Sequence, residues 1–262
     1  MTASWPPLDT HAHIDVTISS TDLIGLRAVV FAANRTLAES RQAIARQPND
    51  LLTVWGLGVH PAVKAALDAF DPDEFAILLE KTAYVSEIGL DGKVKSRLAQ
   101  QRSVLSLVLR MLQNRPRMTS LHSYGATEEL IEELERTPIK GVVLHWWKGD
   151  RATTERASEL GAYFSVNAAG MRGDEALDLI PLDRLLLETD HPDGDRTSPA
   201  PRRPGRVDKV ETVLADRYDL TPTDLREATW RNLKRLIDDV GCGDLLPPRI
   251  FAILLATSSE GK

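Results

Sequence analysis

The chain has 262 residues, a length that a single α/β barrel or a large β-sandwich reaches as one domain. Its hydrophobic fraction of 42% and charged fraction of 27% exclude a disordered, collagen-like or coiled-coil protein. The net charge of −6 has the wrong sign for a protein that coats nucleic acid non-specifically, so any binding of phosphate must be local.

Short apolar runs alternate with amphipathic stretches, which is the pattern of repeated βαβ units. The predicted strands are residues 8–13, 28–34, 53–60, 84–90, 119–124, 141–146, 162–166 and 185–190. The predicted helices are residues 36–46, 73–81, 98–113, 126–136, 152–160, 173–179, 207–218 and 221–240, with Thr36, Asp71 and Thr127 as N-cap residues. Eight strands that alternate with helices favour an α/β fold of the (β/α)8 TIM-barrel type, of the kind found in metal-dependent hydrolases. An open dinucleotide-binding sheet is disfavoured because no G-x-G-x-x-G follows the first strand.

We expect the barrel domain to span residues 1–240 and a C-terminal tail to span residues 241–262. In the tail, Pro247 and Pro248 form a helix stop, and the apolar run 250–255 either docks on the barrel or contacts a partner. No apolar run reaches the roughly 18 residues of a membrane span, and the N-terminus does not resemble a signal peptide. These features predict a cytoplasmic protein that does not associate with membranes.

Ionisable side chains stand at the ends of several predicted strands. His11 and His13 end the first strand, and because side chains alternate along a strand, both point to the same face, the interior of a barrel. The same position in later strands is taken by Glu87, His122, His145 and Asp190. A structural histidine pair is the alternative for the first strand alone, but six such groups would be costly inside a barrel unless they were paired or bound to metal.

Imidazole and carboxylate donors without a thiolate suit zinc, manganese, iron or cobalt, and magnesium less well. The single Cys242 excludes a multi-cysteine zinc site and an internal disulfide. Six donors exceed the needs of one tetrahedral ion, whereas two cations that share a carboxylate would use them all. The sequence therefore favours a binuclear site.

Several segments carry a family resemblance in the order in which they occur. They are DTHAHID at 9–15, GVHP at 58–61, SEIGLD at 86–91, LHSYGATEEL at 121–130, VLHWWKG at 143–149, LGAYFSVN at 160–167 and LLLETDHP at 185–192, and WRNLKRL resembles a closing helix. With these segments the chain resembles the TatD family of metal-dependent DNases, within the amidohydrolase-like barrels. Glu87, where many cyclic-amide hydrolases have a modifiable lysine, favours this family.

The resemblance implies that His11, His13, Glu87 and Asp190 hold one metal ion, and that Glu87 bridges to a second ion held by His122 and His145. It also implies hydrolysis of DNA phosphodiester bonds, usually exonucleolytic, on substrates such as single strands or 3′ ends. The two divalent ions are magnesium or manganese by this resemblance, although zinc, cobalt, nickel and iron also fit the donors.

Catalytic roles follow from the same resemblance and from metal-assisted hydrolysis, in which an ion lowers the pKa of a bound water. We expect Asp190 to act as the general base and Glu87 to act through the ions it bridges. His60 either touches the scissile phosphate and the leaving oxygen or is an ordinary loop histidine. Asp15 and Glu188 are expected to orient the ligand histidines.

The chain departs from the family pattern around the metal site. Ala62 stands where the family usually has a second histidine, and Tyr124 replaces an arginine that could clamp phosphate, although a tyrosine could stack on a base. His191 and Asp193 replace small residues, and the histidine could bind phosphate or donate a proton. Trp146 and Trp147 either line the cleft or pack against the next helix. The substrate therefore stays open.

Two other functions are compatible with the sequence. One is a small-molecule amidohydrolase or deaminase on the same barrel, which the missing arginine and histidine allow. The other is a partner-binding subunit with a weak site, suggested by the apolar run 250–255. The HPDGD segment and the short loops also resemble TatD-like members of bacterial Qat phage-defence systems, which implies protein partners in a defence complex.

Overall fold

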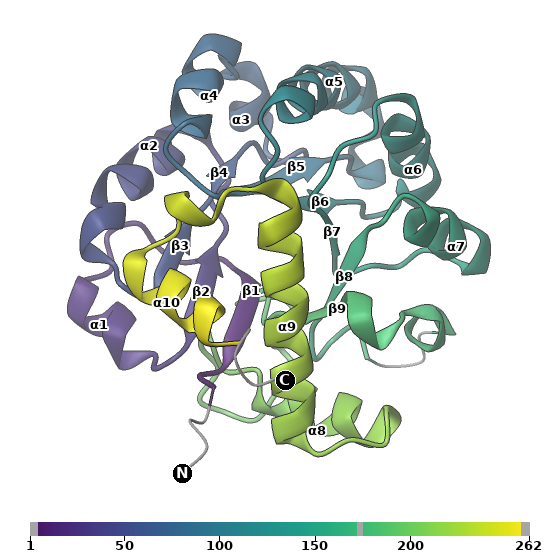
Figure 1. Ribbon diagram of the computed structural model, residues 1–262. Helices are drawn as coiled ribbons and strands as arrows, with labels where there is room; N and C mark the ends of the chain where they lie inside the picture. Colours follow the sequence, from purple (N-terminus) through teal and green to yellow (C-terminus); the bar gives the residue numbers. More distant parts are fainter. Residues whose placement is uncertain (1–4, 172–174, 258–262) are drawn as a thin grey trace.

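A computed structural model describes residues 5–171 and 175–257. In Figure 1 the strands stand at the centre and helices surround them. The strands are β1 Leu8–Ala12, β2 Val29–Ala32, β3 Thr53–Trp55, β4 Leu57–Gly58, β5 Tyr84–Gly89, β6 Met118–His122, β7 Val142–His145, β8 Tyr163–Val166 and β9 Leu185–Leu187. All pairings are parallel, in the orders β1-β2-β3 and β4-β5-β6-β7-β8-β9.

The predicted strand 53–60 is broken at Gly56 into β3 and β4. A Cβ atom at Gly56 would lie 2.5 Å from Ser86 Oγ and 2.8 Å from the Tyr84 ring, so only glycine allows this approach to β5. The backbone N–H of Gly56 still donates to Ala32 O at 2.9 Å. Because β3 and β4 together take the place of one barrel strand, the predicted strand order is confirmed.

The barrel closes between its first and last strands. Thr10 Oγ1 donates to Leu187 O at 2.8 Å, and the backbone N–H of Asp190 donates to His11 O at 2.8 Å. The protein is therefore a (β/α)8 barrel, as its sequence predicts.

The helices follow the predicted positions with few exceptions. The α-helices are α1 Ser20–Gly25, α2 Leu37–Arg46, α3 Lys64–Asp68, α4 Pro72–Leu79, α5 Leu98–Asn114, α6 Thr127–Arg136, α7 Arg151–Glu159, α8 Asp208–Arg217, α9 Pro222–Val240 and α10 Pro248–Ala256. The 3-10 helices are η1 Gln47–Asn49, η2 Gly92–Arg97, η3 Glu175–Leu179, η4 Leu182–Arg184 and η5 Gly243–Leu245. Within residues 5–171 and 175–257, no helix has both the length and the apolar character needed to cross a membrane.

Thr36 and Asp71 cap α2 and α4 as predicted, because each side chain accepts a backbone N–H of the first turn. The prediction for Thr127 is wrong: it is the first residue of α6, and its neighbour Ala126 has no capping side chain. The short helices α1 and α3 are not among the predicted elements. Of the predicted helix 173–179, residues 173 and 174 lie outside the described residues, and the remainder forms η3.

Two apolar clusters fill the molecule. The larger cluster lies mainly between the strands and the outer helices. In the second cluster, Trp230, Leu233 and Ile237 of α9 join buried strand residues such as Leu8 and Met118. Leu8 and Met118 are the first residues of β1 and β6, and α9 crosses this end of the barrel in Figure 1. The N-terminal end of the barrel is therefore filled, and the opposite end is left for a site.

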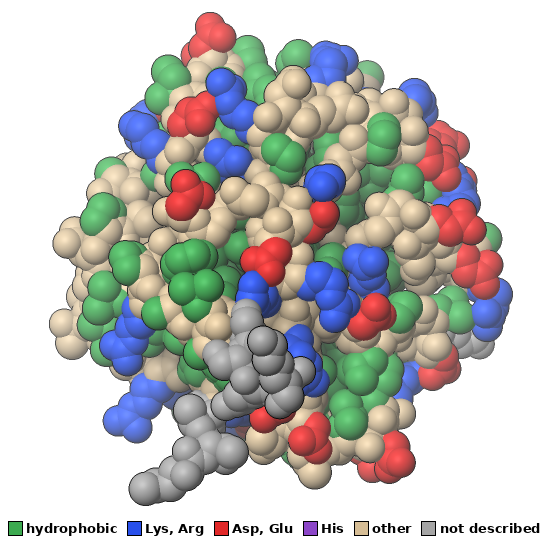
Figure 2. Space-filling model, in the orientation of Figure 1, with side chains coloured by type: hydrophobic (Ala, Val, Ile, Leu, Met, Phe, Trp, Pro, Cys, Tyr) green, Lys and Arg blue, Asp and Glu red, His purple; other side chains and the backbone are tan. Residues whose placement is uncertain are grey.

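The tail forms α10, which packs on the filled end of the barrel. The predicted stop at Pro247 and Pro248 is wrong, because Pro248 is the first residue of α10, a position where a missing N–H has no consequence. Ile250 is fully buried in the second cluster, while Leu255 is 53% exposed. Figure 2 shows this face with acidic and basic side chains interspersed. Of the two alternatives for the apolar run, docking on the barrel is the one observed. A domain boundary after residue 240 stays a prediction.

The packing of α10 can be tested by substitution. We expect Ile250→Ala to lower the free energy of unfolding by about 2–4 kcal/mol, because it removes buried methyl groups and leaves a cavity. Leu255→Ala on the same helix should change it by less than about 1 kcal/mol, since that side chain is half exposed. Urea unfolding followed by circular dichroism measures both. Equal small effects would mean that α10 is not docked.

Candidate metal centre

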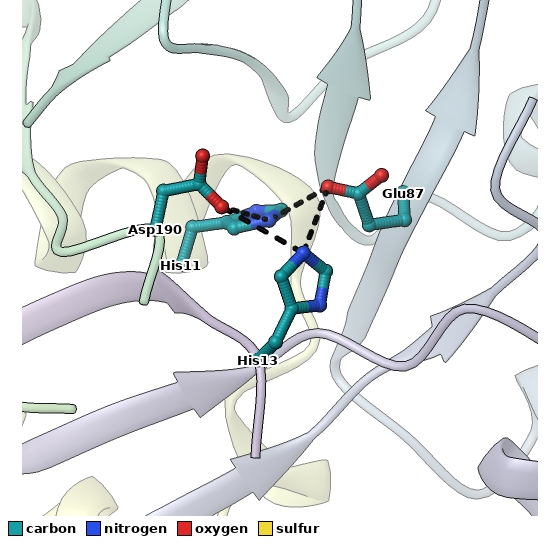
Figure 3. A group of neighbouring side chains, drawn as sticks. All are labelled: His11, His13, Glu87 and Asp190. Atoms are coloured by element: carbon teal, nitrogen blue, oxygen red, sulfur yellow. Dashed lines mark ion pairs between the residues drawn. The ribbon is translucent and has the colours of Figure 1, made fainter. Parts of the chain in front are cut away.

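The six side chains predicted as metal ligands come together at the C-terminal end of the strands. Four of them appear in Figure 3, where His11 and His13 of the first strand point toward Glu87 and Asp190. The other two, His122 and His145, approach Glu87 from neighbouring strand ends, and His60, which was not predicted as a ligand, does so as well. The ligand candidates and their neighbours are His11 in β1, His13 just after β1, His60 after β4, Glu87 in β5, His122 at the end of β6, His145 at the end of β7 and Asp190 after β9.

The first group consists of His11, His13, Glu87 and Asp190, whose ligand atoms all lie within 4.8 Å of one another. Glu87 Oε1 is 2.9 Å from His11 Nε2 and 3.6 Å from His13 Nε2. Asp190 Oδ1 lies 3.6 Å from His13 Nε2 and 3.9 Å from His11 Nε2 (Figure 3). Two imidazoles and two carboxylates converging at this spacing could hold one divalent cation.

The second group consists of His60, Glu87 and His122. Here the other carboxylate oxygen is used: Glu87 Oε2 lies 3.1 Å from His60 Nε2 and 3.7 Å from His122 Nδ1. The two oxygens of Glu87 therefore face two different sets of imidazoles. This is the geometry of a carboxylate that can bridge two ions.

His145 lies closer to the first group than the family resemblance implies. Its Nε2 is 3.3 Å from Glu87 Oε1, and its ring stacks on that of His11 with centroids 4.1 Å apart. It also forms a third group with His11 and Glu188. The ring of His122 is 5.5 Å away from that of His145, so both remain beside the same carboxylate.

The hydrogen bonds of the histidines assign which ring nitrogen is available to a metal. His11 Nδ1 lies 2.7 Å from Ser120 Oγ and 3.1 Å from Tyr84 Oη, so its Nε2 faces the cluster. His13 Nδ1 donates to Ala33 O at 2.9 Å, which likewise leaves Nε2 for the cluster. In the neutral form protonated on Nδ1, each ring would present the lone pair of Nε2 to the first group.

His122 and His60 differ in this respect. His122 Nε2 donates to Asp91 Oδ2 at 3.0 Å, so its Nδ1 presents a lone pair to the second group. His60 Nδ1 instead accepts the backbone N–H of Ala62 at 3.1 Å. A neutral His60 ring therefore carries its proton on Nε2, toward Glu87. His60 has the geometry of a hydrogen-bond donor rather than that of a metal ligand.

Several buried atoms of the cluster lack a hydrogen-bond partner among the described residues. They are His11 Nε2, Glu87 Oε2, His122 Nδ1, His145 Nδ1 and His145 Nε2. Buried polar atoms are nearly always satisfied in folded proteins, so five in one place need an explanation. Divalent cations would satisfy Glu87 Oε2 and one nitrogen of each of these rings, and the residues fit them.

The backbone is strained where the site is formed. Glu87, Trp146 and Asp190 have φ angles of 51°, 41° and 42°, a left-handed conformation that is unfavourable for these residues. The pairing of β5 with β6 also shifts register between Val85 and Ile88, on either side of Glu87. Such strain costs on the order of 1–3 kcal/mol per residue and persists where the surrounding structure enforces it, typically at functional sites.

Burial and close charges set the pKa values of the cluster. Burial opposes ionisation of Glu87, yet His60, His145 and His11 hold its pKa well below its usual range. Burial raises the pKa of Asp190 well above its usual range, and the neighbouring carboxylates add to this. Burial by itself would lower the pKa of His11, but Glu87 and Asp190 raise it to about 9.

The residues that orient the histidines differ from those predicted. Asp15 is exposed, and its Oδ1 accepts from Thr17, so the role predicted for Asp15 is wrong. Glu188 lies beside His11 and His145, but its hydrogen bonds come from Trp146 N, Ser165 Oγ and Asn167 Nδ2. The orienting groups are instead Tyr84, Ser120, the Ala33 carbonyl and Asp91. Of these groups, only Asp91 belongs to a segment that the sequence marks as part of the family pattern, where it is the last residue of SEIGLD.

A cavity of about 530 Å³ opens beside the cluster, a size typical of ligand sites. Its lining includes Tyr124 and Trp146 as well as His60, Glu87 and Asp190. Trp147, by contrast, is 4% exposed, and its Nε1 donates to Thr154 Oγ1 at 2.8 Å. Of the two alternatives for the tryptophans, Trp146 lines the cleft and Trp147 packs against α7.

The pKa shifts predict how metal binding depends on pH. The raised pKa of His11, about 9 against 6.5, contributes stability below about pH 6.5 that is lost as pH rises through 9. Burial raises the pKa of Glu188 to about 7. Ionisation of Glu188 therefore also lowers the stability of the folded protein as pH rises from about 4.5 through 7. A cation held by His11 would displace the proton of that ring, so cation binding releases protons and strengthens as pH rises.

We therefore expect manganese to raise Tm more at pH 8.5 than at pH 6.0, by about 2–4 °C for each additional kcal/mol of binding free energy. Differential scanning fluorimetry measures the shift, and titration calorimetry in buffers of different ionisation enthalpy counts the protons. An equal or larger shift at pH 6.0 would contradict this assignment of charges.

Several known proteins are similar to this chain in sequence, and one solved structure is similar to it in fold. The model of the TatD related DNase family matches residues 8–238. The uncharacterized metal-dependent hydrolase YcfH of Escherichia coli is 29% identical over 200 residues, covering 70% of this chain and 73% of YcfH. The deoxyribonuclease Tat-D of Schizosaccharomyces pombe is 38% identical over 79 residues, 28% of this chain and 25% of that protein. The crystal structure of the TatD homolog YJJV from Escherichia coli superimposes with a TM-score of 0.77 at 23% identity, covering 90% of this chain and 98% of YJJV. The chain belongs to the TatD related DNase family.

Proposed function

We propose that this protein hydrolyses phosphodiester bonds of DNA with the help of two divalent cations. One observation carries the proposal: the two carboxylate oxygens of Glu87 face separate sets of imidazoles. Both sets contain buried ring nitrogens without a hydrogen-bond partner. The name of the Schizosaccharomyces pombe relative, a deoxyribonuclease, supports DNA as the substrate. Magnesium and manganese are the expected ions, and zinc, cobalt, nickel and iron also suit the donors.

We assign the ligands from the available ring nitrogens. His11, His13 and Asp190 would hold one ion, His122 and, as the family resemblance implies, His145 would hold the other, and Glu87 would contact both. When bound, such ions act as Lewis acids toward a phosphoryl oxygen and make water a better nucleophile at neutral pH. Hydrogen bonds to His11, His13 and His122 keep these ligand atoms in place.

Asp190 is the proposed general base. Its side chain is only 7% exposed, yet it lines the cavity in which the scissile phosphate would lie. Its carboxylate faces the first group through Oδ1, which leaves Oδ2 for a proton from the attacking water. Its backbone N–H is fixed to His11 O at 2.8 Å, so the strand that supplies two ligands also positions this base.

His60 is the proposed contact to the substrate. Its Nδ1 is occupied by the Ala62 N–H, so a neutral ring directs an N–H from Nε2 toward the cluster. That donor could bind a phosphate oxygen or accompany the leaving oxygen. We expect His60→Ala to reduce turnover while leaving the metal content unchanged.

Purified protein treated with EDTA and then supplied with magnesium, manganese, zinc, cobalt or nickel tests this function. Single- and double-stranded DNA and RNA are the substrates, and an Asp190→Asn variant is the control for contaminating nucleases. The proposal requires metal-dependent release of nucleotides from DNA that the variant lacks. Activity that survives Asp190→Asn undiminished would remove the assigned role.

A small-molecule hydrolase is the second candidate, because a cavity of about 530 Å³ suits a compact substrate. Such an enzyme would ignore DNA and hydrolyse an amide, lactone or amino-purine. The apolar run that suggested a partner-binding subunit now has another explanation, since Ile250 and Leu254 are buried against the barrel. The phage-defence role, its protein partners and a cytoplasmic location stay predictions.

A further inference from the structure

We propose that Tyr124 and Trp146, each with a cation over its ring, form a subsite that binds unpaired bases next to the scissile phosphate. This inference rests on the proposed function and adds the residues that select the substrate. Two cation–aromatic pairs carry it: Lys93 with Tyr124, and Arg196 with Trp146. All four residues line the cavity that opens beside the metal centre.

The first pair stands at the ends of β5 and β6. Lys93 Nζ lies 4.2 Å from the centroid of the Tyr124 ring, and Tyr124 is 48% exposed. The backbone holds the two loops together, because Gly92 N–H donates to Tyr124 O at 2.7 Å and a Cβ at Gly92 would collide with Gly125 O. An aromatic ring held half exposed by its backbone is available for stacking.

In the second pair, Trp146 directly follows β7 and Arg196 lies in the segment between β9 and α8. Arg196 Cζ lies 4.9 Å from the centroid of the Trp146 ring. Trp146 has a φ of 41°, and its backbone N–H donates to Glu188 Oε1 at 3.0 Å, which holds the residue directly after His145 in this conformation. Arg196 Nη1 donates a hydrogen bond to the backbone carbonyl of Asp193 at 2.7 Å, which holds the guanidinium group in place. The strained backbone thus directs an aromatic ring into the cavity.

The chemistry of these pairs matches that of a single-stranded nucleic acid. Aromatic side chains stack on bases irrespective of sequence, while Lys and Arg groups beside them bind the backbone phosphates. Bases in a duplex are stacked on each other and present no free face, so the subsite selects unpaired ends. Although the protein carries a net charge of −6 and carboxylates also line the cavity, Lys93 and Arg196 supply positive charge beside the two rings, where it can bind backbone phosphates.

The test compares a short single-stranded DNA with the same strand carrying abasic residues at the last two positions of both ends. Stacking is worth roughly 5- to 100-fold per base in affinity. We expect abasic ends to lower kcat/KM and binding of the wild-type protein by at least about tenfold. Tyr124→Leu and Trp146→Leu should each cause a loss of similar size on the normal strand and little further loss on the abasic strand.

Three controls make the result specific. Tyr124→Phe keeps the ring and should restore most of the discrimination between the two strands. Phe251→Leu replaces an exposed aromatic residue of α10, at the other end of the barrel, and should behave like the wild type. Metal content, measured by mass spectrometry, should be unchanged in Trp146→Leu, which adjoins His145.

Binding is also measured by fluorescence anisotropy with EDTA at low ionic strength, so the inference can be judged without cleavage. Equal binding of normal and abasic strands by the wild type would overturn the subsite. So would an equal loss on both strands in Tyr124→Leu, because a purely structural role would weaken both alike. Strand-selective binding without cleavage in any metal would uphold the subsite and refute the proposed function.

Discussion

Glu87→Gln is expected to lower kcat/KM by about 10³-fold or more. The change keeps the shape of the side chain but removes the negative charge that both groups of histidines face. Two ions contribute several kcal/mol of transition-state stabilisation, and about 1.4 kcal/mol corresponds to tenfold in rate. Losing one ion or its correct position therefore has a large effect.

Metal content separates this explanation from simple misfolding. Inductively coupled plasma mass spectrometry after dialysis against manganese should give about two ions per chain for the wild type and at most one for Glu87→Gln. Glu135→Gln, on an exposed residue paired with Arg156, is the matched control and should retain full activity. A Glu87→Gln protein with two ions and normal turnover would refute the bridging role.

Asp9→Ala is expected to lower the free energy of unfolding by about 3–5 kcal/mol. Asp9 is fully buried, and its carboxylate accepts four hydrogen bonds. Oδ1 accepts from Thr189 N at 2.9 Å and His11 N at 3.3 Å, and Oδ2 accepts from Thr189 Oγ1 at 2.6 Å and Gly205 N at 2.7 Å. Alanine would leave these buried donors without a partner.

The same bonds join β1 to the segment after β9, where the barrel closes and where His11 and Asp190 are positioned. We therefore expect Asp9→Ala to lose metal affinity as well as stability, although Asp9 is not itself one of the proposed ligands. Urea unfolding and manganese titration measure the two effects. Asp216→Ala, an exposed residue of α8, should change the free energy of unfolding by less than about 0.5 kcal/mol. An Asp9→Ala protein as stable as this control would contradict the role of Asp9 in closing the barrel.

The sequence by itself determined the order of the elements and the residues at the strand ends. Apolar periodicity is a local property, so the strands that contain His11, Glu87, His122 and His145 could be predicted from their own segments. Once the fold was a parallel barrel, these side chains had to meet at one end, because all the strands run in the same direction. The composition of the candidate site was predictable for this reason.

Other features depended on neighbours distant in the chain. The break at Gly56 arises from the approach of Tyr84 and Ser86, and Ile250 finds its contacts only because α9 covers the end of the barrel. The partners that orient His11 and His122, and the four donors around Asp9, come from other strands and loops. Only the tertiary structure decided these, because a hydrogen bond or a close contact is fixed by position in space and leaves no periodic signal in the sequence.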